Sequence, residues 1–166
     1  MKKRGLLLTI TEPPPAMEEE FNAWYDTEHL AERLAIPGFR SAQRWVMDCA
    51  PGEGKYLATY ELDSLSVLSS REYLSRFENQ SPWSRRCLGK TVVFRRWACE
   101  QVDPGEADPH PGARAIAIGM IEASIPGALQ TRRFAATSGE RIVLKELADG
   151  RATAPAGVLL YRAYDP

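Results

Sequence analysis

The sequence has few cysteines and histidines and no long hydrophobic run. Its three cysteines, Cys49, Cys87 and Cys99, are widely spaced and form no Cys-x-x-Cys pair. This argues against a disulfide scaffold or a zinc site and favours a reducing cytoplasm. No segment approaches the ~20 apolar residues needed to cross a bilayer. The formal net charge of −1 gives no reason to expect nucleic acid or an acidic membrane surface as a partner.

Common catalytic signatures are also missing. The sequence contains no glycine-rich phosphate loop, no metal-ligand spacing and no Ser-His-Asp or Cys-His arrangement. The basic start, Met1–Arg4, resembles that of a signal peptide. However, the apolar run that follows is too short for one and is followed by three prolines. We therefore interpret residues 6–11 as a first strand.

The pattern of apolar residues predicts the fold of the first part of the chain. Its elements follow in the order strand, helix, strand, strand, helix, strand, which is the ferredoxin-like βαββαβ pattern. The predicted strands are 6–11, 39–47, 55–62 and 91–98, and the predicted helices lie within 15–34 and 65–78. Residues 81–86 are expected to be irregular.

The second part of the chain resembles a shortened copy of the first. A linker rich in proline and glycine at 103–113 separates a first domain, 1–102, from a second, 114–166. Ile125–Phe134 aligns without gaps with Ile36–Trp45. Four strands are predicted in the second part, and no helices; the strands are about 115–121, 128–136, 141–147 and 158–164.

These elements predict an α+β fold. The helix-poor second sheet is expected to pack on the free face of the first and to close an eight-stranded barrel. A sheet that is apolar on both faces cannot leave either one in water without a large unsatisfied patch. Because the second sheet has lost its helix cover, we expect a homodimer through its bare face.

The most informative segment is Phe21–Leu30, which reads as an amphipathic helix. Tyr25 and His29 are four residues apart and lie on one helix face. The ordinary pKa of histidine is close to physiological pH, so His29 is the natural candidate for proton transfer, with Tyr25 as a hydrogen-bond donor to substrate. The structural alternatives are that His29 helps to end the helix and that Tyr25 packs in the core.

Arginines within predicted strands are a second candidate feature. Burying an unpaired charge costs several kcal/mol, so these arginines must face water or a polar cavity. If Arg44 and Arg95 face the barrel interior, they could clamp a carboxylate or enolate; a salt bridge with Glu61 is the alternative. Tryptophans nearby would form pocket walls or simply core. The candidate substrate-binding residues are Trp24, Arg44, Trp45, Glu61, Arg95 and Trp97.

A group of motifs resembles a known superfamily. They are Phe21-Asn22-x-Trp24-Tyr25-Asp26-x-Glu28-His29-Leu30, Ile36-Pro37-Gly38-Phe39 and Ser81-Pro82-Trp83-Ser84-Arg85-Arg86. Together they resemble the dimeric α/β-barrel superfamily, and within it the EthD-like branch, over about residues 5–98. The sequence departs from that pattern at Ala31, where proline is expected, so the helix is expected to run on.

The resemblance implies ferredoxin-like units paired into a barrel, which in many relatives encloses a pocket for an aromatic or polyketide-like molecule. Relatives include cofactor-independent monooxygenases, cyclases, isomerases, dehydratases and decarboxylases, and others bind haem, so the fold does not fix the reaction. We predict a cofactor-independent enzyme that performs acid/base chemistry of the lyase, isomerase, cyclase or dehydratase type on an aromatic or polyketide-like carbonyl metabolite. The alternatives are a non-catalytic small-molecule-binding or assembly protein and a haem-binding or haem-degrading protein. The expected partners are a small-molecule substrate and a second copy of the chain.

Overall fold

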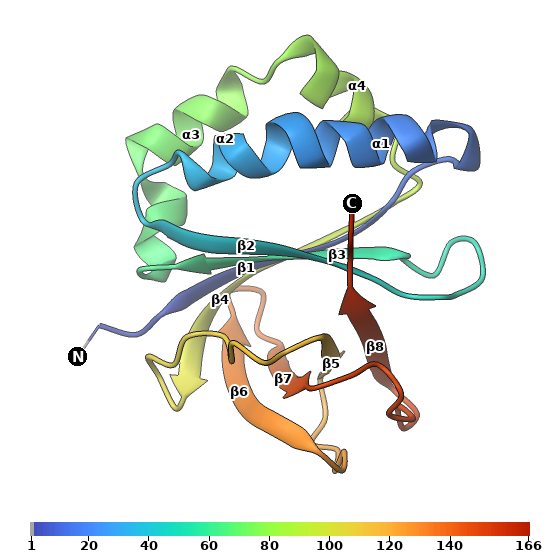
Figure 1. The fold of residues 1–166 in the computed structure, drawn as a ribbon. Coiled ribbons are helices and arrows are strands. Elements are labelled where there is room, and N and C mark those ends of the chain that lie inside the picture. Colours follow the sequence, from blue (N-terminus) through green and yellow to red (C-terminus); the bar gives the residue numbers. More distant parts are fainter. Residues whose placement is uncertain (1) are drawn as a thin grey trace.

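The computed structural model describes residues 2–166 and shows an α+β fold built around a closed eight-stranded barrel (Figure 1). Around the barrel the strands follow the order β1-β3-β2-β8-β5-β7-β6-β4, and all neighbours are antiparallel. The strands are β1 (Gly5–Glu12), β2 (Phe39–Val46), β3 (Tyr56–Leu62), β4 (Val93–Asp103), β5 (Ala115–Gly119), β6 (Ala128–Ala136), β7 (Arg141–Leu147) and β8 (Val158–Ala163). The helical segments are η1 (Pro15–Met17), α1 (Glu18–Trp24), η2 (Tyr25–His29), α2 (Leu30–Leu34), η3 (Leu65–Ser69), α3 (Arg71–Glu78) and α4 (Pro82–Gly89).

The first half has the predicted βαββαβ order, and all of its helices lie on one side of its sheet (Figure 1). Every residue of β1 and β3 is buried, because the helices cover one face and the barrel core covers the other. Leu7 and Tyr60 belong to the core beneath the helices, whereas Leu6 and Leu57 belong to the core inside the barrel. No helix within residues 2–166 is long and apolar enough to cross a membrane.

The two halves share a detail of strand pairing that supports the internal repeat. The register shifts at Arg40 in β2 and again at Leu129 in β6, which are aligned positions of the two copies. Just beyond each bulge, a glutamate stands on the neighbouring strand, Glu61 in β3 and Glu146 in β7. The two glutamates therefore occupy matching places in the two halves, and both point into the barrel.

Loops, and not helices, cover part of the outer face of the second half. Ala115, Ala117 and Leu147 are buried there with Ile125, which lies in the loop before β6, and Ala152 packs against them. The small alanine side chains let these loops approach the sheet closely. This apolar cluster forms within one chain, and the homodimer stays a prediction.

The structure corrects the expectation that residues 81–86 are irregular, since they form most of α4. Ser81 caps this helix by accepting a hydrogen bond from the backbone N–H of Ser84 at 3.0 Å, and Pro82 occupies the first turn. Serine at the N-cap followed by proline is a common way to begin a helix. In the sequence, Ser81 and Pro82 were the only signal that a helix begins here.

Candidate functional site

The predicted site residues are divided between two layers of the molecule. Those on the barrel side of the sheets, where they line cavities, are Trp45, Glu61, Arg95 and Trp97. Those between the helices and the outer face of the first sheet are Trp24, Tyr25, His29 and Arg44. Arg44 therefore does not face the barrel interior, which was the condition for its clamping a carboxylate or enolate there, and His29 lies beneath the helices and not inside the barrel.

Arg44 is a structural residue that joins the C-terminus to the first helix. Its side chain is 3% exposed, with Nη1 3.2 Å from Asp26 Oδ1 and Nη2 donating to Asn22 Oδ1 at 2.8 Å. The guanidinium also lies over the rings of Tyr25 and Tyr164, 4.3 and 4.1 Å from their centroids. Its carboxylate partner is Asp26, and not Glu61 as the alternative reading proposed.

A small cavity lies beneath the helices, and three of the residues that line it carry a buried polar atom without a partner. Within residues 2–166, only four buried side-chain polar atoms have no hydrogen-bond partner, and three of them belong to residues that line this cavity. They are Thr9 Oγ1, His29 Nδ1 and the hydroxyl of Tyr60. Burying such a group without a hydrogen-bond partner lowers the stability of the fold by about 1–3 kcal/mol. We define this cavity, of about 70 Å³, as the helix–sheet cavity.

Cationic and apolar side chains surround the helix–sheet cavity. Arg33 lies over the ring of Tyr73, and Arg96 donates to the Tyr73 hydroxyl at 3.0 Å. Phe77 and Phe94 also line the cavity, yet they are 61% and 53% exposed. Two exposed aromatic rings therefore stand among the residues that line the cavity.

A π-helical turn sets the direction of the His29 side chain. In η2 the backbone N–H of Leu30 donates to the carbonyl of Tyr25, five residues earlier, which inserts one residue into the α-helical pattern. As a result Trp24, Tyr25 and His29 are all buried, and the imidazole stacks on the Trp24 ring at a centroid distance of 4.3 Å. Such turns occur frequently at functional sites.

Glu28 holds Trp24 in place, and through it the imidazole. The Trp24 Nε1–H donates to Glu28 Oε2 and to Ser84 Oγ, both at 3.1 Å. The Ser81 hydroxyl donates to the same carboxylate oxygen at 2.7 Å. The carboxylate therefore fixes the stacking partner of His29 and connects the first helix to the beginning of α4.

The His29 imidazole is neutral at physiological pH. Burial, together with the nearby positive charges of Arg33 and Arg44, lowers the pKa of His29 to about 3. Burial also holds the pKa of the Tyr60 hydroxyl well above its ordinary value, with a contribution from Tyr25. The imidazole is thus a neutral hydrogen-bond acceptor beside a neutral phenol donor.

The low pKa of His29 predicts that acid destabilises the fold. The unfolded chain protonates this histidine below about pH 6.5, whereas the folded chain does not do so until about pH 3. The free energy of unfolding should therefore fall by about 1.4 kcal/mol per pH unit between these limits because of this residue. Urea unfolding at pH 7, 5 and 4 should show a smaller loss in His29→Gln than in the wild type. Equal losses in both proteins would show that the ring is not buried in its neutral form.

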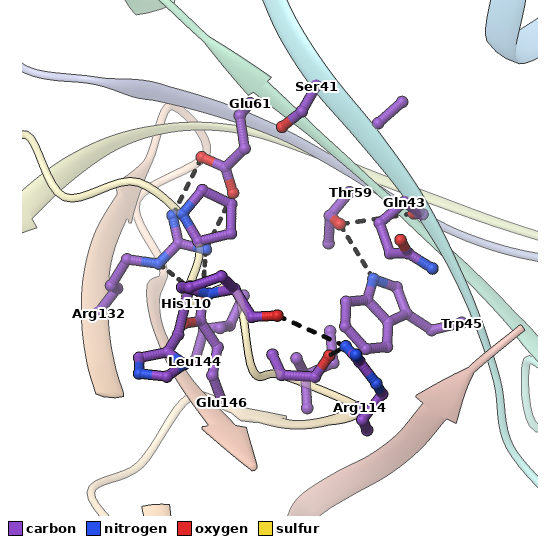
Figure 2. A pocket seen from close by; sticks show the side chains of 15 residues that line it. Ser41, Gln43, Trp45, Thr59, Glu61, His110, Arg114, Arg132, Leu144 and Glu146 are labelled. Atoms are coloured by element: carbon purple, nitrogen blue, oxygen red, sulfur yellow. Dashed lines mark hydrogen bonds and ion pairs between the residues drawn. The ribbon is translucent and has the colours of Figure 1, made fainter. Parts of the chain in front are cut away.

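A second cavity, of about 270 Å³, lies inside the barrel beside a buried ion triad (Figure 2). Arg132 lies between Glu61 and Glu146, with nitrogen–oxygen distances of 2.9–3.0 Å to the first and 2.6–2.9 Å to the second. The backbone N–H of His110, in the linker, donates to Glu146 at 2.7 Å. Burial raises the pKa of Glu61, and the charge of Arg132 opposes this effect. Because the charged groups pair with one another, we regard the triad as structural.

Sequence reasoning missed several residues of these two sites. Thr9 and Tyr60 line the helix–sheet cavity, and Arg132 stands between the two glutamates. The only available signal was a polar group within a predicted strand. Such a signal shows that a residue needs a partner, but it does not show where the partner lies.

The helix–sheet cavity does not fit haem. At about 70 Å³, the cavity is too small to enclose a tetrapyrrole. Residues 2–166 contain no group of three or more His, Cys, Asp or Glu side chains placed to hold a metal ion.

Comparisons with solved structures identify the class to which the fold belongs. The chain resembles an anthrone oxidase-like protein with a TM-score of 0.63 and 13% identity, over 99% of this chain and 92% of that one. It also resembles a chlorite dismutase-like protein with a TM-score of 0.53 and 9% identity, over 99% and 96% of the two chains. The chain therefore has the dimeric α/β-barrel fold, as predicted.

The sequence comparisons cover a smaller part of the chain. A curated relative, core atranone cluster protein 1 of Stachybotrys chlorohalonatus, is 32% identical over 80 residues. That match covers 47% of this chain, and it spans only 34% of the relative. No protein-family model matches the chain. The EthD-like branch stays a prediction.

Proposed function

We propose that this chain is an enzyme that removes a proton from an acidic C–H group conjugated to a carbonyl, in an aromatic or polyketide-like compound bound at the helix–sheet cavity. The observation that carries the proposal is the convergence of Thr9, His29 and Tyr60, each with an unpaired buried polar atom. A ligand that carries a carbonyl oxygen and an acidic C–H group conjugated to it would satisfy these atoms together.

Each group has a defined part in this reaction. The hydroxyls of Tyr60 and Thr9 donate hydrogen bonds to the carbonyl oxygen, and His29 Nδ1 takes the proton from carbon. The electron pair of the C–H bond moves onto the oxygen and forms an enolate. Arg33 and Arg96 line the same cavity, and their positive charges stabilise that oxyanion.

The negative charge that develops on the substrate oxygen also compensates for the weak basicity of the His29 imidazole. The pKa of about 3 reflects desolvation and the charges of two arginines, which oppose protonation of the ring. An enolate beside the ring offsets part of that positive field and raises the proton affinity of His29 as the proton moves. Return of the proton to the same or another atom completes an exchange or an isomerisation.

The apolar rim favours a flat ligand. Phe77 and Phe94 are exposed beside the cavity, and aromatic side chains stack well on ring systems. The likeness to an anthrone oxidase-like structure and to a protein of the atranone cluster supports a role in the chemistry of such compounds. Anthrone, a tricyclic ketone with an acidic methylene group, is therefore a suitable first probe.

Hydrogen–deuterium exchange of the anthrone methylene in D₂O tests the proposal without knowledge of the later steps. The wild-type protein should accelerate this exchange, as followed by proton NMR. Tyr60→Phe should slow the catalysed rate by about 10²-fold, because it removes one donor to the forming oxyanion. The matched control is Tyr164→Phe, which lies outside the cavity and should keep the wild-type rate. No acceleration by the wild type, or equal rates in all three proteins, would refute the proposal.

A further inference from the structure

An apolar cavity of about 240 Å³ lies at the end of the barrel opposite the ion triad. Leu8 and Ile10 of β1 pair in register with Trp97 and Arg95 of β4 along one wall. The opposite wall is formed by residues of the second half, namely Ile118, Ile142 and Leu159. Neither the helix–sheet cavity nor the proposed reaction uses any of these side chains.

Arg95 is the one charged residue that lines this apolar cavity. Its side chain is exposed, and within residues 2–166 it takes part in no hydrogen bond or ion pair. Arg44, Arg132 and Arg133 by contrast are each joined to carboxylates. The guanidinium of Arg95 therefore keeps all of its donors for water or for a ligand.

The mouth of this cavity is open and apolar. Gly119 and Gly157 line it without side chains, and Gly157 has a φ of +80°, which favours glycine there. Met120 and Ile121, at the same mouth, are 50% and 54% exposed. Exposed apolar side chains around a cavity are typical of binding sites.

We propose that this end of the barrel is a second binding site, which takes a small aromatic monocarboxylate. Arg95 pairs with the carboxylate, and the apolar walls and the Trp97 ring enclose the aromatic body. A single cation with no other charged group favours a monoanion over a phosphate or a dicarboxylate. A cavity of about 150 Å³ holds benzene, so this one has room for a ligand of one or two rings.

Calorimetric titration of the full chain with 2-naphthoate tests this site. Arg95→Gln should weaken binding about tenfold, since it removes a charge-assisted pair. The uncharged analogue 2-naphthylmethanol should bind the wild type and Arg95→Gln equally. The matched control is Arg85→Gln, on α4 and outside the cavity, which should bind 2-naphthoate as the wild type does.

Two further measurements locate the ligand. Leu159→Trp fills the cavity and should abolish binding, whereas Thr9→Val, in the helix–sheet cavity, should leave it unchanged. In the wild type, nuclear Overhauser contacts from naphthoate protons to the methyl groups of Ile118 and Ile142 should appear, and this readout needs no variant. Unchanged affinity in Arg95→Gln, no binding by the wild type, or loss of binding in Thr9→Val would overturn the proposal.

Discussion

Replacing His29 by glutamine should slow the catalysed hydrogen exchange of anthrone by about 10²- to 10⁴-fold, the usual contribution of a positioned general base. Glutamine keeps a polar side chain beneath the helices but cannot take up a proton at this position. Of the groups that line the helix–sheet cavity, only the imidazole combines an unpaired acceptor with the ability to become protonated. The rate is measured by proton NMR in D₂O.

The chain offers a matched control for this substitution. His110 is the only other histidine, and it lies in the linker, where its Nδ1 accepts a hydrogen bond from the backbone of Gly112 at 3.0 Å. His110→Gln should keep the wild-type exchange rate. If His29→Gln also kept it while Tyr60→Phe did not, the imidazole would not be the base.

The second large effect concerns the ion triad inside the barrel. Arg132→Met should lower the free energy of unfolding by about 3–5 kcal/mol at pH 7, because it leaves Glu61 and Glu146 buried beside each other without a cation. Urea unfolding gives the value. The loss should shrink as the pH falls and Glu61, whose pKa is raised by burial, becomes protonated.

The neighbouring arginine is the control for this prediction. Arg133 points away from the barrel and pairs with Asp103 and Glu122 at the surface. Arg133→Met should cost less than about 1 kcal/mol, as exposed ion pairs usually do. A triple variant with Glu61→Gln, Arg132→Met and Glu146→Gln should recover much of the lost stability. Equal costs for the two arginine variants would mean that the triad is not buried.

Much of the fold could be predicted from the sequence, because alternating and continuous apolar runs are strong local signals. The strands predicted at 128–136 and 141–147 coincide with β6 and β7. The helix that was expected to run on past Ala31 continues to Leu34. The barrel itself followed from the observation that neither face of the second sheet could remain in water.

The position of the site could not be predicted, and the reason is physical. Alternation showed that Arg44 and Trp45 occupy opposite faces of β2, but it could not show which face is inside the barrel. Both faces of the first sheet are buried, one by the helices and the other by the second half. The π-helical turn at Tyr25–His29 also has no signature in an amphipathic pattern, and it decides where His29 points.

The pairing of residues far apart in the chain likewise could not be predicted from the sequence. The structure shows Glu61 and Glu146 at matching positions of the two halves, and nothing in the sequence links Arg132 to either. A single arginine between two pseudo-equivalent glutamates breaks the symmetry of the two halves, since Gln43 stands at the aligned position in the first copy. Only the closed barrel brings the three side chains together.

The most direct test of the proposed function is nitrogen-15 NMR of the histidine side chains, which is simple in a chain with two histidines. The His29 ring should remain neutral from pH 8 to pH 4, and its Nδ1 resonance should shift when anthrone is added. A His29 ring that titrates near pH 6.5, or an Nδ1 resonance that ignores the ligand, would contradict the proposal that a buried, unpaired imidazole receives the proton.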